Sequence, residues 1–170
     1  TGYVIFLNRT CFNGLFRVNS KGYFNVPHGK YKNPRICDKE NIMAVSRALK
    51  GVKITHEDFG TILEDTGKLT FYYLDPPYKP LNKTSSFTSY DKSNFSDGEQ
   101  ERLKKFCDKI HSRGHYFMLS NSDPRNHDPG NTFFHDLYAG YHIQTVKAKR
   151  SINSNGKDRG AINELLITNY

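Results

Sequence analysis

The 170-residue sequence contains no tryptophan, no paired cysteines and no long apolar run. Its three cysteines, Cys11, Cys37 and Cys107, lie far apart and form no Cys-x-x-Cys pair, so neither a zinc site nor a disulfide framework is indicated. Unpaired cysteines are typical of a reducing compartment, and we therefore expect a cytoplasmic protein. No segment approaches the roughly 18 apolar residues of a membrane span, so we expect no membrane partner.

Acidic residues are absent from the first 35 positions, which hold six basic ones. Residues 147–160 are similarly basic, with five Lys or Arg against Asp158 alone. These two stretches have net charges of +6 and +4, so the rest of the chain, whose total is +8, sums to −2. Concentrated positive charge indicates a polyanion partner, although a solvated basic surface is an equal alternative on charge alone.

The first 50 residues predict a small segment of their own. Residues 3–12 are apolar and fit the end of a helix or a strand, and residues 16–26 read as a hairpin that turns at 19–22. Asp38 is placed to cap a helix that Gly51 ends, with apolar residues at helical spacing.

Residues 51–170 predict alternating strands and helices. Strands are expected at 52–59, 68–75, 115–121, 141–148 and 163–170. A helix begins at Ser96, where Glu99 completes a capping box, and ends near Gly114, and a short helix covers 131–138. The order predicts an α/β fold whose sheet is mostly parallel and ends in an antiparallel hairpin.

The sequence Asp75-Pro76-Pro77-Tyr78 ends the strongest strand candidate. Ligands of open α/β sheets bind beyond the carboxyl ends of strands, and consecutive prolines stiffen the backbone there. The Asp75 carboxylate and the Pro76 carbonyl are acceptors, and Tyr78 offers a flat ring. This set suits a planar group that bears an NH₂, such as a nucleobase amine held for attack on a methyl group. A strand followed by a plain Pro-Pro turn is the alternative.

These four residues resemble the catalytic motif of the Dam-type, DpnII-like adenine-N6 DNA methyltransferases of the D12 class, which recognise GATC. The resemblance extends through residues 6–9, 12–19, 24–34, 71–81, 87–90, 118–122, 149–156 and 163–170. It implies a partial Rossmann-like, S-adenosylmethionine-dependent methyltransferase sheet over 51–170 and a target-recognition segment over 1–50. It also implies double-stranded DNA as the partner and a flipped adenine as the substrate, often within restriction-modification systems.

The resemblance assigns residues as well as fold. It implies that the catalytic residues are Asp75, Pro76, Pro77 and Tyr78. It also implies that S-adenosylmethionine is contacted by Asp58, Phe59 and Asp75. The DNA-binding positions are Arg9, Phe12, Asn13, Leu15, Arg17, Pro27, Tyr31, Lys149, Arg150, Ser151, Asn153 and Asn155. Phe12 and Asn13 match positions that fill the space left by the flipped base, and Arg17 suits the paired acceptors of guanine.

Two features of the family do not occur in this sequence. The sequence contains no Gly-x-Gly loop, which in the family holds the methionine part of the cofactor. It also contains no Gly-Gly-Lys motif, which in the family precedes that loop. We therefore expect the chain to be incomplete as an isolated enzyme and to need the N-terminal part of the same enzyme. The rival functions are a non-catalytic DNA-binding fragment and an amino methyltransferase for cytosine, RNA or a protein amide. His111 and His115 have no evident third ligand, so no metal site is indicated.

Overall fold

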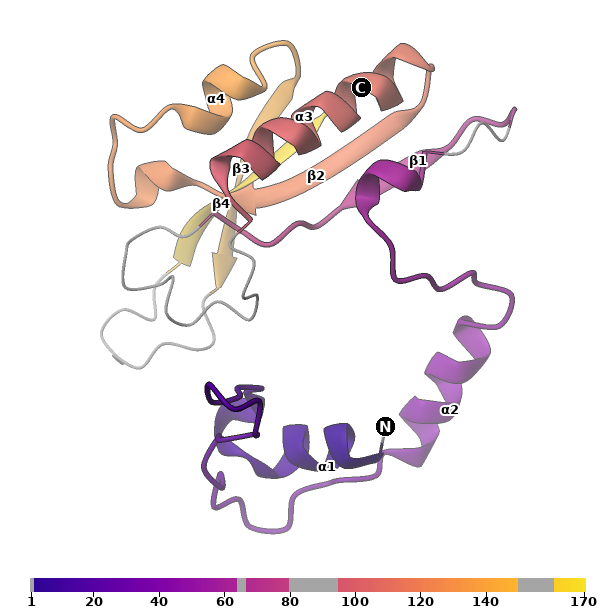
Figure 1. Ribbon diagram of the computed structural model, residues 1–170, viewed down its shortest axis with the longest axis vertical. Helices are drawn as coiled ribbons and strands as arrows, with labels where there is room; N and C mark the ends of the chain where they lie inside the picture. Colours follow the sequence, from indigo (N-terminus) through magenta and orange to yellow (C-terminus); the bar gives the residue numbers. More distant parts are fainter. Residues whose placement is uncertain (1, 64–66, 80–94, 150–160) are drawn as a thin grey trace. The chain divides into compact units, whose positions relative to one another are not determined.

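Apolar and aromatic strands build a four-stranded sheet in the order β1-β2-β4-β3 (Figure 1). The computed structural model describes residues 2–63, 67–79, 95–149 and 161–170. The strands are β1 (Phe71–Leu74), β2 (Tyr116–Ser122), β3 (His142–Lys149) and β4 (Ala161–Thr168). β1 is parallel to β2, and β4 is antiparallel to both β2 and β3. The predicted α/β sheet with a closing antiparallel hairpin is therefore confirmed.

One face of this sheet is covered by helices (Figure 1). α3 (Asp97–Ser112) places its apolar stripe against the strands, and α4 (Phe133–Leu137) packs into the same core. The fully or nearly buried side chains include Leu103, Phe106, Cys107, Ile110, Phe117, Leu119, Phe134, Tyr138, Leu165 and Ile167. The helices predicted at 96–114 and 131–138 are thus confirmed, and they set the positions of the strand ends.

Ser96 caps α3 as predicted, since its hydroxyl accepts a hydrogen bond from the Glu99 amide. The Glu99 carboxylate accepts from Arg102, so only one half of the expected capping box is seen among the described residues. Gly114 follows the helix with φ of +73°, a left-handed conformation that favours glycine.

The opposite face of the sheet is not covered by any helix that the structure describes between residues 57 and 170. Phe71 and Tyr73 of β1 and Tyr116 of β2 point to this face and are exposed. Tyr170 packs against Phe71 and Tyr116 with ring centroids 6.3 and 5.5 Å apart. Sheets with parallel strands usually have both faces covered, so this apolar face is unusual for a finished domain.

Thr1–His56 forms a separate compact unit, here the N-terminal unit, and Glu57–Tyr170 forms the C-terminal unit. The N-terminal unit contains α1 (Gly2–Thr10), the 3₁₀ turn η1 (Phe12–Gly14) and α2 (Lys39–Ala48). The predicted hairpin is present as a bridge between Val18 and Phe24, with the Gly22 amide closing the turn on the Asn19 carbonyl. Asp38 caps α2 as predicted.

The predicted strand at 52–59 is wrong. Residues 52–58 are irregular, and the 3₁₀ turn η2 (Phe59–Thr61) follows them. The Asp58 carboxylate caps this turn by accepting from the Gly60 amide. A strand requires a neighbouring strand to satisfy its backbone groups, and β1 is an edge strand of the described sheet with no partner on its outer side. Local β-propensity was therefore insufficient.

The burial of the Cys107 thiol in the core predicts that the protein loses stability at alkaline pH. Burial raises the pKa of the Cys107 thiol from about 9 to about 12. Because the raised pKa belongs to the folded state, the free energy of unfolding should hold up to about pH 9. It should then fall by up to about 1.4 kcal/mol per pH unit as the unfolded thiol ionises. Urea unfolding at pH 8, 9 and 10 measures this decline.

The variant Cys107→Ala should show a smaller decline between pH 8 and 10, although it will be less stable at every pH. Cys37→Ala is the matched control, because Cys37 is exposed. An equal alkaline decline in Cys107→Ala and Cys37→Ala would contradict this assignment.

Candidate functional site

The turn Asp75–Tyr78 begins where β1 ends. Because β1 and β2 are parallel and Leu74 pairs with Leu119, Asp75 lies beside Ser120 at the carboxyl ends of both strands. The Asp75 side chain is exposed and accepts a hydrogen bond from Ser120 Oγ, 2.9 Å from Oδ1. The carboxylate thus lies outside the core with one oxygen engaged, and the other can accept from a ligand.

Tyr78 points back to the sheet. Its hydroxyl donates to Glu164 Oε2 on β4 at 3.4 Å, and the ring is about one-third exposed. Partial burial raises the pKa of Tyr78 above its ordinary value, a hydrogen bond with Ser120 lowers it by less, and the nearby charges of Glu164 and Asp75 raise it. Tyr78 therefore stays neutral near pH 7.

Lys79 anchors the end of the turn through its backbone. Its amide donates to Asn121 Oδ1 at 3.2 Å, and its carbonyl accepts from Ser122 Oγ at 2.8 Å. Its side chain forms an ion pair with Asp97, and Nζ lies 3.9 Å from the ring centroid of Phe133. The turn is consequently fixed to β2 at both of its ends.

Sequence reasoning missed Ser120, Asn121, Ser122 and Glu164. A signal was present, because three polar residues end the otherwise apolar strand β2. Side chains at the carboxyl ends of neighbouring parallel strands meet at one edge of a sheet. Combining that rule with the predicted parallel pairing points to residues 120–122, whereas Glu164 required the position of β4.

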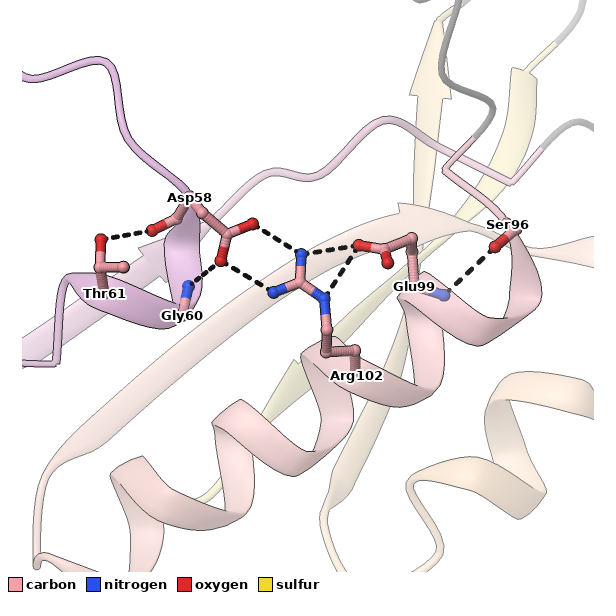
Figure 2. Close-up of polar contacts among 6 residues, drawn as sticks. All are labelled: Asp58, Gly60, Thr61, Ser96, Glu99 and Arg102. Atoms are coloured by element: carbon pink, nitrogen blue, oxygen red, sulfur yellow. Dashed lines mark hydrogen bonds and ion pairs between the residues drawn. The ribbon is translucent and has the colours of Figure 1, made fainter.

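Arg102 of α3 holds Asp58 through two hydrogen bonds, as Figure 2 shows. The guanidinium donates to both Asp58 oxygens at 2.8 Å, bonds Glu99, and lies 3.9 Å from the ring centroid of Phe59. The hydrogen bond from Arg102, with a second from the Gly60 amide, lowers the pKa of Asp58. Phe59 also packs against Phe106 of the core.

In the N-terminal unit, the structure brings together most of the residues predicted to contact DNA. The Phe12 amide donates to the Pro27 carbonyl at 2.8 Å, and the Asn13 amide donates to the Tyr31 hydroxyl at 2.9 Å. Asn13 has φ of +54°, in the left-handed region. Phe12, Asn13, Pro27 and Tyr31 are exposed, and Leu15 is half-buried.

Tyr31 lies against a glycine that has no room for a side chain. A Cβ on Gly29 would overlap the Tyr31 ring and come within 2.8 Å of the Cys11 carbonyl oxygen. The Gly29 amide also donates to the Thr10 carbonyl at 2.8 Å. Glycine at this position therefore lets Tyr31 reach the Asn13 amide.

Arg17 is held across the hairpin by Asn25. Its Nε donates to Asn25 Oδ1 at 2.9 Å, and its Nη2 donates to the Asn25 carbonyl at 3.1 Å. Both residues are exposed. Nη1 and the second Nη2 hydrogen remain on the outer edge of the guanidinium, so the side chain is fixed with a donor pair pointing outward.

Six further positions are predicted to contact DNA. Arg9 is exposed in the last turn of α1. Lys149 ends β3, and Arg150, Ser151, Asn153 and Asn155 lie outside the described residues. The N-terminal unit has ten basic and two acidic residues, so it carries the entire net charge of +8. The C-terminal unit is neutral overall, with fifteen of each.

A cavity of about 470 Å³ lies at the other end of the strands. It is lined by Gly67–Leu69 and by Arg113–His115, at the amino ends of β1 and β2. The turn at 75–78 is at the carboxyl ends, so this cavity does not belong to the candidate site.

Comparison with known protein families identifies the family of this chain. Residues 2–152 match the family described as D12 class N6 adenine-specific DNA methyltransferase. The chain is a member of this family. The match covers both the N-terminal unit and the turn at 75–78, so the two candidate sites fall within the D12 class.

Relatives of the D12-class chain include named methyltransferases. It is 56% identical over 167 residues to the type II methyltransferase M.MjaIII of Methanocaldococcus jannaschii, covering 98% of this chain and 56% of that protein. It is 40% identical over 169 residues to the type II methyltransferase M1.LlaDCHI of Lactococcus lactis subsp. cremoris, covering 98% and 57%. It is 36% identical over 163 residues to a DNA adenine methylase of Vibrio cholerae, covering 95% and 56%. The chain therefore spans a little over half the length of these relatives.

The fit of the D12-class cofactor can be tested on Asp58. Its Oδ2 accepts one hydrogen bond among the described residues, from Arg102, so it can accept a second from an adenine amine. Phe59 is half-buried, with one ring face under Arg102 and with Phe95 and Phe106 packed against the ring, so it adds an apolar surface beside Asp58. These two residues fit the adenine part of S-adenosylmethionine. Among the helices that the structure describes, none is long and apolar enough to cross a membrane.

The hydrogen bonds between Arg102 and Asp58 lead to a prediction about the pKa of Asp58 and the stability of the protein in acid. In Arg102→Gln, the pKa of Asp58 should rise towards its ordinary value near 3.8, because its principal hydrogen-bond donor is lost. A lowered pKa stabilises the fold only where the carboxyl is ionised, so the stability difference from wild type should exist above about pH 4 and vanish as the pH falls through the folded pKa. Carboxyl NMR titration and unfolding at pH 3 to 6 measure both effects.

Lys105→Gln is the matched control, because Lys105 is an exposed cation on the same helix. The assignment fails if Lys105→Gln shifts the Asp58 titration as much as Arg102→Gln does.

Proposed function

We propose that this D12-class chain acts in a site-specific DNA adenine-N6 methyltransferase. The enzyme moves a methyl group from S-adenosylmethionine to a flipped adenine, with GATC as the recognition sequence. The observation that carries the proposal is the exposed Asp75 carboxylate, held by Ser120 at the carboxyl end of β1 and followed by a stiff Pro-Pro turn and a tethered tyrosine.

The proposed mechanism must overcome the weak nucleophilicity of the adenine amine. The lone pair of an adenine amine is delocalised into the ring, which makes the nitrogen a poor nucleophile. Asp75 and the Pro76 carbonyl accept its two hydrogens, and the lone pair then becomes available for attack. Pro77 fixes the backbone of the turn, and Tyr78 stacks on the base. Bound S-adenosylmethionine supplies the electrophilic methyl group.

The proton leaves after the methyl group has been transferred. The methylated nitrogen is then positively charged and strongly acidic, so Asp75 needs only to accept a proton and pass it to solvent. The neutral Tyr78 side chain, whose pKa is raised, keeps its hydroxyl bonded to Glu164 through this step. Asp58 and Phe59 hold the adenine part of the cofactor beside this edge of the sheet.

The N-terminal unit supplies the DNA contacts in this proposal. Its net charge suits the phosphate backbone, and its exposed Phe12 and Asn13 fill the gap left by the flipped base. Arg17 presents its outer donor pair to N7 and O6 of the GATC guanine. Leu15 lies with Arg17 at the guanine, and Pro27 contacts the thymine methyl with Tyr31 beside it. The phosphate contacts come from Arg9 and from Lys149, Arg150, Ser151, Asn153 and Asn155.

The apolar face of the sheet supports a further requirement of the proposal. Phe71, Tyr73 and Tyr116 are exposed there, and the chain spans a little over half of its relatives. We infer that the remaining part present in those relatives covers this face and completes the cofactor site. Residues 1–170 alone should then bind DNA with little or no methyl transfer.

Asp75→Ala should abolish methylation, by at least about 100-fold, because the amine loses its charged acceptor. DNA affinity should stay within about twofold, since Asp75 belongs to the neutral C-terminal unit. Transfer of labelled methyl groups from S-adenosylmethionine to a GATC duplex measures the first effect, and filter binding measures the second. The enzyme is assayed in its complete form.

Asp136→Ala provides the control, because Asp136 is an exposed carboxylate of α4. Full activity in Asp75→Ala would contradict the mechanism. Methylation of cytosine, RNA or a protein amide in place of adenine would show a related transferase, and DNA binding without any transfer would show a non-catalytic DNA-binding protein.

Asn25→Ala should weaken sequence discrimination, because Arg17 loses the partner that orients it. Preference for GATC over a duplex with the guanine pair replaced should fall by about tenfold. The salt dependence of binding should not change, since no charge is removed. Titrations of both duplexes at two salt concentrations measure these quantities.

Asn41→Ala is the control, since Asn41 is an exposed asparagine of the same unit. Equal losses of affinity for the two duplexes in Asn25→Ala would show that Asn25 supports the hairpin and not the reading of guanine.

A further inference from the structure

Three polar residues end a strand whose preceding positions are apolar. Ser120, Asn121 and Ser122 close β2 and are 8%, 0% and 4% exposed. Buried polar side chains must find hydrogen-bond partners, and two of these three, Asn121 and Ser122, bond the backbone of Lys79 at the far end of the segment that follows β1. The third, Ser120, bonds the catalytic carboxylate itself.

We propose that Ser120, Asn121 and Ser122 are positioning residues that hold the Asp75–Lys79 segment in the geometry needed for amine attack. This inference rests on the proposed function and adds residues to it. None of the three needs to touch the base or the cofactor, because each acts through an atom of the turn.

Ser120 selects the orientation of the Asp75 carboxylate. Its Oγ donates to Oδ1 at 2.9 Å, which stops the carboxylate from rotating and directs Oδ2 to the amine. Ser120 lies on the same sheet face as Glu164, since Ser122 pairs with Glu164 and alternate residues share a face. Glu164 in turn accepts from the Tyr78 hydroxyl. The acceptor and the stacking ring are therefore fixed from one face.

Asn121 fixes the far end of the segment with an amide whose orientation is defined. Its Oδ1 accepts from the amides of Lys79 and Ser122, at 3.2 and 2.9 Å. Its Nδ2 donates to Oε1 of the buried Gln100 at 3.1 Å. Because an amide has a donor end and an acceptor end, the bond to Gln100 keeps the oxygen facing Lys79.

Ser122 completes the attachment by donating to the Lys79 carbonyl at 2.8 Å. Both backbone polar groups of Lys79 are thus bound by adjacent side chains of β2. Asp75 is bound at the start of the segment, and Pro76 and Pro77 have fixed φ angles between the two anchors. A segment held in this way has few free backbone rotations that would move its acceptors, which is the preorganisation that the reaction requires.

Positioning and plain structural support differ in their kinetic effects. A structural loss lowers stability and acts on binding and turnover alike. A loss of positioning lowers kcat and leaves the KM values for DNA and cofactor unchanged, because the misplaced acceptors matter only during methyl transfer.

The experiment compares Ser120→Ala, Ser120→Thr and Ser122→Ala in the complete active enzyme, with Ser112→Ala as the control. Ser112 is an exposed serine whose hydroxyl bonds the Lys109 carbonyl of its own helix. We expect Ser120→Ala and Ser122→Ala to lower kcat by about 10- to 100-fold, with KM values within twofold. Ser120→Thr, which keeps the hydroxyl, should recover most of the rate.

Each outcome decides the inference. Unchanged kcat in Ser120→Ala and Ser122→Ala, with Asp75→Ala inactive, overturns the inference and leaves the proposed function standing. Loss of stability and binding in proportion to kcat, without rescue by Ser120→Thr, shows structural support only and also overturns it. If Ser120→Ala does not fold, Ser122→Ala is judged by the same criteria. An inactive wild-type enzyme would refute the proposed function itself.

Discussion

The parallel pairing of β1 with β2 is the constraint on which the candidate site depends. It aligns the carboxyl ends of the two strands, with Leu74 opposite Leu119, so the next residue of each strand brings Asp75 to Ser120. An antiparallel neighbour would have placed the amino end of β2 there, with His115 and Tyr116 in place of three polar residues. The stiffness of the Pro-Pro turn is useful only because β2 fixes both of its ends.

Charge and chemistry are divided between the two units of the chain. The N-terminal unit carries the whole net positive charge, and the C-terminal unit is neutral overall, with Asp75 and Glu164 at the turn. A neutral catalytic sheet suits a reaction in which a cationic donor transfers its charge to the base. A strongly basic unit suits a phosphate backbone, whose attraction does not depend on sequence. In the proposed function, specific reading rests on a few fixed side chains, of which Arg17 is the best defined.

Much of this architecture could be predicted from the sequence. The apolar stripe of α3 and the β-branched and aromatic strands have periodicities that agree with their packing in the core. The Asp75–Tyr78 motif indicates a strand end, because its prolines cannot continue the strand. The segment 52–59 could not be predicted in this way. It has residues typical of a strand, but a strand forms only where the edge of a sheet is available for pairing. Here the Asp58 carboxylate caps η2 and accepts a hydrogen bond from Arg102 instead.

The hydrogen bonds around the turn were also beyond sequence reasoning. Ser120, Asn121 and Ser122 could be suspected from their polarity, but their partners depend on which side chains the strand register brings together. Glu164 lies 86 residues from Tyr78, and only the antiparallel β4 brings it near. Likewise, Asn25 is an ordinary hairpin asparagine in sequence, and its grip on Arg17 appears only when the hairpin is formed.

Amide hydrogen exchange at Lys79 tests the central claim most directly. If β2 holds the turn rigidly, the Lys79 N–H is bound to Asn121 and should exchange only when the sheet opens, at a rate close to that of the amides within β2. Exchange at the rate of an unstructured peptide, while β2 stays protected, would contradict the account, because the acceptors of the turn would then not be fixed before reaction.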